Sequence, residues 1–75
     1  MTLHHTAPGG TARIRRLSGE PVLRERLAEL GLTPGQSVRM LRRAPLGDPL
    51  EILVRGYRLA VRRDEAEAIE VESAD

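Results

Sequence analysis

The segment Arg24–Gly35, RERLAELGLTPG, carries the signals that decide the fold. Leu23, Leu27 and Leu30 follow an i, i+4, i+7 spacing, which places them on one face of a helix, while charged residues occupy the other faces. Pro21 suits the first helical position, where its missing N–H would have no intrahelical partner. The spacing therefore predicts an amphipathic helix that begins near Pro21 and buries its leucine face.

Gly31 is expected to end this helix, because glycine readily adopts the left-handed conformation that closes a helix. In that arrangement Leu32 folds back toward Leu27 as an apolar contact. Pro34 and Gly35 then fit the two central positions of a type II turn, the second of which needs a positive φ. The helix should lead through this turn directly into a strand.

Five other segments show the alternation of apolar and polar residues that is typical of half-buried strands. Gly56 marks a tight hairpin between two of them, and the run RRAPLGDP at 42–49 breaks the pattern as a loop. Asp64 is expected to cap a single helical turn through Ala68. The expected strands are 11–17, 36–41, 50–54, 57–61 and 69–71.

Short strands and one early helix in 75 residues predict a mainly β fold, a small SH3-like barrel whose closure removes exposed strand edges. We expect a flexible N-terminal arm at 1–9, the barrel domain at 10–72 and an acidic tail at 73–75. The expected inward-facing side chains are Ala12, Ile14, Leu23, Leu27, Leu30, Val38, Met40, Leu50, Ile52, Val54, Leu59, Val61, Ile69 and Val71.

The composition limits the class of protein. The sequence has no Cys, which excludes disulfides and thiolate metal sites and fits a cytosolic protein. The longest aliphatic run is three residues, at 52–54, far short of the roughly 20 needed to span a bilayer. Residues 1–63 hold 12 Arg and five acidic residues, whereas 64–75 hold six acidic residues and no base. A basic body fits a polyanionic partner, but the use of Arg without any Lys is better explained by a coding bias of the source genome.

The motifs, taken in order, resemble the FeoA family, the small cytosolic accessory domain of bacterial ferrous-iron uptake. The resemblance covers nearly all of 7–71. Similar barrels also occur at the end of metal-dependent repressor chains, but those chains carry a winged DNA-binding domain that is absent from this sequence. The motifs that carry the resemblance are an early Gly with Ala12-Arg13-Ile14, then RLAELGL at 26–32, Pro34-Gly35, PLGDP at 45–49, and 66–71.

The resemblance implies a non-enzymatic protein that binds the cytoplasmic side of the membrane iron permease FeoB, which carries a GTP-binding domain. It also implies a cytoplasmic location, at the inner face of the membrane through that partner. Assembly into a homo-oligomer stays open. The alternative from another class is an RNA- or ribosome-binding barrel, which the basic body and the arginines Arg39, Arg42 and Arg43 around one loop would favour.

Catalytic and metal chemistry have little support in the sequence. A phosphate-binding P-loop needs a Lys, and the only imidazoles that could act as a base for a Ser, His4 and His5, lie in the expected arm. The His4-His5 pair could bind iron or zinc or could simply be part of that arm. Asp64, Glu65 and Glu67 could bind a hard cation or serve only for capping and solvation. We therefore predict no catalytic, cofactor or metal site.

A partner-binding surface is predicted at the end of the helix, its turn and the 45–49 loop. Arg24 and Arg26 could act on a partner's GTP-hydrolysis site or could simply pair with Glu25 and Glu29 along the helix. Leu41 and Leu53 are expected to point outward, either under the helix or toward a partner. The predicted partner-binding residues are Arg26, Glu29, Leu32, Pro34, Leu41, Leu46, Asp48 and Leu53.

Overall fold

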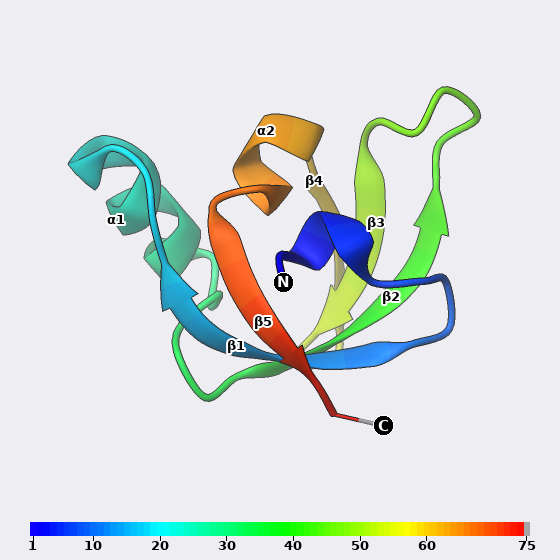
Figure 1. Ribbon diagram of the computed structural model, residues 1–75, viewed down its shortest axis with the longest axis horizontal. Helices are drawn as coiled ribbons and strands as arrows, with labels where there is room; N and C mark the ends of the chain where they lie inside the picture. The colour runs from blue at the N-terminus through cyan, green and yellow to red at the C-terminus, as the bar shows by residue number, and fades with distance from the viewer. Residues whose placement is uncertain (75) are drawn as a thin grey trace.

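The computed structural model describes residues 1–74. Its strands form one five-stranded antiparallel sheet in the order β4-β3-β2-β1-β5 (Figure 1). This architecture confirms the predicted mainly β, SH3-like fold with a helix after the first strand. In chain order the elements are the 3-10 turn η1 (Leu3–His5), β1 (Thr11–Leu17), α1 (Pro21–Glu29), β2 (Ser37–Arg43), β3 (Leu50–Val54), β4 (Tyr57–Val61), α2 (Arg63–Ala66) and β5 (Ile69–Ser73).

The core lies against the inner face of the sheet, and the strand alternation explains its composition. Ala12 pairs across strands with Val38, and Met40 pairs with Ile52, so that apolar side chains meet on one face. Most of the predicted inward set is buried. The buried apolar residues are Leu3, Ala12, Ile14, Leu27, Leu32, Val38, Met40, Leu50, Ile52, Val54, Val61, Ala66, Ala68, Ile69 and Val71.

Three predicted core residues differ from the expectation. Leu23 and Leu59 are only partly buried at the margin of the core. The prediction for Leu30 was wrong, because this side chain is 36% exposed. Leu30 is the C-terminal cap residue, where φ −81° and ψ 1° leave the helical path, so the i+7 spacing no longer directs it inward.

The helix ending and the turn agree with the sequence prediction. Gly31 has φ +91°, and the Leu32 N–H donates to the Leu27 carbonyl oxygen at 3.1 Å, which closes the helix. The next turn is closed by the Gln36 N–H, which donates to the Thr33 carbonyl at 3.0 Å. Leu32 is thereby placed in the core.

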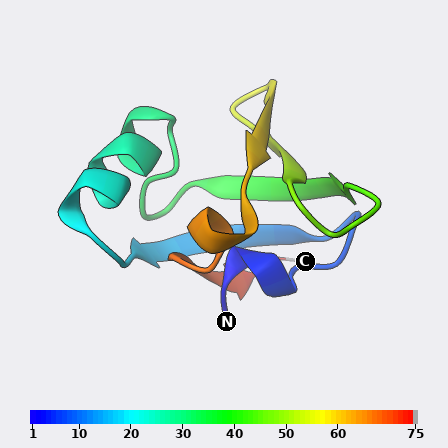
Figure 2. The same ribbon diagram turned by 90° about the horizontal axis from the view of Figure 1, so that it is seen from above.

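The sheet curls around the core at two irregularities. The register shifts between Ile14 and Arg16 in β1 and between Met40 and Arg42 in β2, and such bulges bend a strand and increase its twist. The sheet ends at β4 and β5, and within residues 1–74 no strand pairing joins these two edges. The expected closure by strand pairing was therefore wrong. In its place α2 connects the two edge strands (Figure 2).

The N-terminal segment is packed, which contradicts the flexible arm predicted for 1–9. Leu3 is fully buried, and the Val71 N–H donates to the Met1 carbonyl at 2.8 Å. An isolated bridge also joins Thr2 to Glu70. The segment is ordered because the outer edge of β5 offers it backbone partners and the core offers it an apolar site.

The predicted boundary between the domain and the acidic tail, at residue 73, was also too early, because the sheet continues past it. Ser73 belongs to β5 and pairs with Ala12. The Ala74 N–H donates to the Thr11 carbonyl at 3.0 Å, and Asp75 lies outside the described residues.

Candidate partner-binding site

The loop between β2 and β3 is held at both ends. The Ala44 N–H donates to the Pro49 carbonyl at 3.0 Å, and the Gly47 N–H donates to the Ala44 carbonyl at 2.7 Å. Asp48 Oδ1 accepts the backbone N–H of Arg63 at 3.0 Å, which fastens the loop to the start of α2. The loop is therefore a pre-formed projection, seen at the upper right of Figure 1.

Leu46 lies at the tip of this loop with 96% of its surface exposed. An aliphatic side chain that contacts so little of its own chain contributes almost nothing to the core. Because the loop backbone is already held in place, binding through Leu46 would need little further ordering of the loop. Its exposure agrees with the sequence prediction, whereas the Asp48 carboxylate is already engaged within the chain.

The end of α1 is joined to the rest of the domain by two side chains, one of which, Arg26, was predicted to face a partner. The Arg26 guanidinium pairs with the Glu65 carboxylate of α2. The Tyr57 hydroxyl of β4 donates to the Leu30 carbonyl. Arg26 is thus engaged within the chain, and the pairing expected along the helix gives way to a contact between elements far apart in sequence.

Among the other residues predicted at this end, Glu29 and Pro34 are exposed, but Leu32 has 0% exposure. The prediction of Leu32 as a surface contact was wrong, because the turn that closes the helix directs it inward. Pro34 borders an open, mostly apolar groove of about 540 Å³ between α1 and the end of β1. The lining residues are Arg16, Leu17, Pro21, Arg24, Glu25, Ala28 and Pro34.

Leu53 and Leu41 differ in how far they reach the outer face of the sheet. Leu53 is 36% exposed in β3, opposite Arg39 and Arg58 on the neighbouring strands. Leu41 is only half-buried, because it lies at the bulge of β2, where the alternation is interrupted. The outward prediction therefore holds for Leu53 and only in part for Leu41.

The predicted residues do not form one surface. Figures 1 and 2 place α1 and its turn at one end of the molecule and the β2–β3 loop at the other. The principal extents of the molecule are 29 × 25 × 23 Å. The loop tip and the adjoining outer face of β3, with Leu46 and Leu53, are the part of the prediction that remains accessible.

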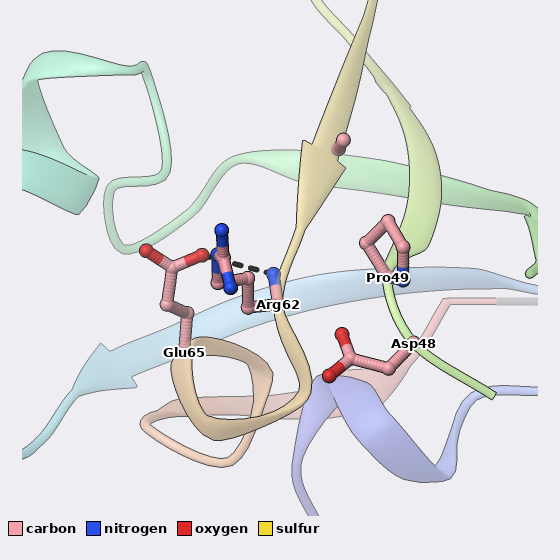
Figure 3. Close-up of a pocket in the computed structure, with 5 residues that line it drawn as sticks. Asp48, Pro49, Arg62 and Glu65 are labelled. Carbon is pink, nitrogen blue, oxygen red and sulfur yellow. Dashed lines mark hydrogen bonds between the residues drawn. The ribbon is translucent and has the colours of Figure 1, made fainter. Parts of the chain in front are cut away.

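A second hollow, of about 470 Å³, lies beside the start of α2 (Figure 3). Asp48, Pro49, Ala60, Arg62 and Glu65 line it. Its acidic groups already serve the fold, since Glu65 Oε1 accepts the Arg62 N–H at 2.9 Å and Asp48 accepts that of Arg63. The helical turn begins at Arg63, so Asp64 is not the cap residue as predicted but lies in the first turn, where its Oδ1 accepts the Glu65 N–H at 3.0 Å.

Most of the basic side chains are engaged, which bears on the RNA alternative. Arg42 approaches Glu51 at 3.5 Å, and Arg43 donates to the carbonyls of the N-terminal segment, so that Arg39 is the one arginine of that predicted trio without a recorded partner in 1–74. Tyr57, the single aromatic residue, uses its hydroxyl within the fold. A stacking surface for single-stranded RNA is therefore missing from the described residues.

Metal ligands do not converge in the part of the chain that the structure describes. No group of three or more His, Asp or Glu side chains there is placed to hold a metal ion. His5 Nδ1 lies 3.0 Å from the Thr2 hydroxyl, and the His4 ring is packed beside arginines. The sequence offered two interpretations of the His4-His5 pair, a metal site or part of a flexible arm. The observed packing matches neither of them.

The structure is thus a small SH3-like domain with a projecting loop that carries the exposed Leu46. The FeoA domain model matches residues 1–73. The chain belongs to the FeoA family, whose members are accessory proteins of ferrous-iron transport.

Known relatives agree with this assignment. A Porphyromonas gingivalis Fe(2+) transport protein A/Fe(2+) transporter FeoB fusion protein is 36% identical over 72 residues, which are 96% of this chain and 8% of the fusion protein. The solution structure of iron(II) transport protein A from Clostridium thermocellum superposes with a TM-score of 0.93, at 38% identity, over 99% of this chain and 46% of that one. This chain thus spans less than half the length of either relative.

A third relative is the zinc complex of Stenotrophomonas maltophilia FeoA, described as a prokaryotic SH3-domain protein. It is 32% identical, covers 96% of this chain and 89% of its own, and has a TM-score of 0.83. The SH3-like fold predicted from the sequence therefore has an experimental counterpart within the family.

Proposed function

We propose that this protein binds the cytoplasmic part of a FeoB-type ferrous-iron permease and influences transport, without a catalytic step of its own. The observation that carries this proposal is the fusion relative, in which an FeoA-like segment and the FeoB transporter belong to one chain. Partners that act together at one place are often joined in this way, because the linker raises their effective concentration. None of the helices in 1–74 is long and apolar enough to cross a membrane.

The surface proposed for this contact is the loop tip and outer sheet face defined by Leu46 and Leu53. Leu46 is the most exposed large apolar side chain in the described chain, at 96%, and Leu53 lies on the adjoining strand. Exposed apolar side chains bordered by polar residues are a common feature of protein–protein interaction sites. Arg39 and Arg58 flank Leu53 and provide such a polar surround.

The experiment is a titration of the purified permease cytoplasmic domain with this chain, followed by calorimetry at low salt. The natural chain is expected to bind, and Leu46→Ser should weaken binding at least tenfold, which is about 1.4 kcal/mol. Val22→Ser is the matched control, because Val22 is 76% exposed on α1 at the opposite end and should leave binding unchanged. No association at tens of micromolar would contradict the proposed function, whereas equal weakening by both variants would contradict only the proposed surface.

A further inference from the structure

The segment Met1–Thr6, which we call the strap, closes over β5 and the core. Its backbone pairs with β5 through Met1 and Thr2, and its Leu3 side chain has no exposed surface. Figures 1 and 2 show η1 lying beside α2 and β5. The strap is therefore a short packed element whose position depends on few contacts.

One cation from the sheet fastens the strap. Arg43 Nη2 donates to the His4 carbonyl at 2.6 Å and to the Thr6 carbonyl at 2.9 Å. Both acceptors are neutral, and no recorded carboxylate within 1–74 pairs with Arg43, so its full positive charge remains beside the strap. A second positive charge near the Arg43 guanidinium would repel it and so weaken its hydrogen bonds to the strap.

The His4 side chain belongs to the residue whose carbonyl Arg43 binds. Its Nδ1 atom is buried and has no hydrogen-bond partner in the described residues. Burial first, and then Arg63 and Arg43, lower the pKa of His4, with a further lowering from His5 and an opposing effect of Glu67. A proton on this ring would add a positive charge that Arg63 and Arg43 both disfavour, on an imidazole with a buried nitrogen that no acceptor meets.

We propose that the strap is a pH-sensitive closure, in which protonation of His4 releases Met1–Thr6 from β5 and from the core. The neutral ring is compatible with the closed strap, whereas the charged ring repels Arg43, the residue that clamps it. Release would uncover the site of Leu3 and the N–H of Val71. This inference concerns the conformation of the chain and stands independently of the proposed permease contact.

The direction of the pH effect follows from the lowered pKa. The released strap binds a proton on His4 more readily than the closed strap does, since the ordinary pKa is 6.5 and the closed-state pKa lies below it. Closure is therefore fully favoured above about pH 6.5 and is weakened as the pH falls from there toward the closed-state pKa.

The test is amide hydrogen exchange of the full chain, measured by NMR at pH 7.5 and pH 5.0 and corrected for intrinsic exchange. The reporters are the N–H groups of Val71 and Thr6, which donate to Met1 and Leu3. The reference is the N–H of Ile14, which donates to Gln36 just before β2. Protection of the two reporters should fall, by up to about tenfold for each pH unit between the two pKa values, while Ile14 keeps its protection. The proposal would be overturned if each of the three amides kept the same protection at pH 5.0 as at pH 7.5.

Variants separate this closure from a general effect of acid. His4→Gln and His4→Phe, one polar and one apolar, should both abolish the pH dependence of Val71, whereas the matched control His5→Gln should retain it. In a direct titration of the imidazole, Arg63→Gln should raise the pKa of His4, because it removes one of the two cations facing the ring. The proposal fails if the dependence persists without His4, if it disappears with His5→Gln, or if His4 titrates while Val71 and Thr6 stay protected.

Discussion

Asp48 in the β2–β3 loop accepts the backbone N–H of Arg63 through Oδ1, at 3.0 Å. The two residues are 15 positions apart, and their contact joins the projecting loop to the first turn of α2. A carboxylate at this place serves the otherwise unpaired N–H groups that every helix leaves at its start. The position of the loop and the start of the helix are therefore coupled.

Asp48→Ala is expected to lower the free energy of unfolding by about 1 kcal/mol, because the Arg63 N–H loses its acceptor. Urea denaturation followed by circular dichroism measures the change. Asp48→Asn keeps an oxygen at the same place and should lose less than half as much. Equal losses in the two variants would show that the charge, and not the acceptor, matters at this site.

Leu27→Ala and Leu30→Ala should differ strongly, although the helical spacing treats the two residues alike. Leu27 is 1% exposed and Leu30 is 36% exposed. Removing the buried side chain should cost about 2–4 kcal/mol, which brings a domain of this size close to unfolding, and Leu27→Asp should unfold it outright. Leu30→Ala should cost about 1 kcal/mol or less, and melting temperatures provide the comparison. Similar melting temperatures for the two alanine variants would contradict the packing of α1.

Gly31→Ala and Gly35→Ala both place a side chain at a positive φ, +91° and +92° respectively, and both should lose about 1 kcal/mol. An added Cβ at Gly31 would also lie 3.2 Å from Cδ of Arg55, whereas nothing lies within 4 Å of one at Gly35. Gly31→Ala should therefore be the more destabilising variant in chemical denaturation. The reverse order would indicate that Arg55 moves aside without cost.

Leu3→Ala tests whether the N-terminal segment belongs to the core. A fully buried leucine should cost about 2 kcal/mol or more when truncated. Met1→Ala is the control, since Met1 is 61% exposed and should change the unfolding free energy by less than about 0.5 kcal/mol. An unaffected Leu3→Ala variant would support the flexible arm that the sequence suggested.

Much of the fold follows from local patterns. The helix start at Pro21, its end at Gly31 and the turn at Pro34-Gly35 depend on backbone preferences that hold wherever these residues occur. The strands follow from alternation, because one face of each must be buried. These elements were predicted to within two residues of the observed bounds.

The packing of the N-terminal segment could not be predicted in this way. Leu3 stands among polar and small residues with no periodicity, and its burial depends on the outer edge of β5, which is nearly 70 residues away in the sequence. The Arg26–Glu65 pair was missed for the same reason. A long-range ion pair leaves no spacing signal, whereas Glu29 offered an obvious partner along the helix.

The exposure of the candidate residues was predicted in part. Leu46 and Leu53 were selected because apolar side chains in a turn and on an outward strand position have no local cover, and both are exposed. Leu32 was selected as part of the turn, but the helix-closing contact directs it inward. Which exposed residues share one face depends on the curl of the sheet, which the sequence pattern does not contain.

The pairing of Met1 and Thr2 with β5 has a consequence for handling the protein. An unprotected strand at the end of a sheet is a template on which other molecules add their own strands, leading to aggregation. The two residues occupy part of that template on β5. Shortened versions lacking the first nine residues should therefore precipitate at lower concentrations, and purification handles belong at the C-terminal end.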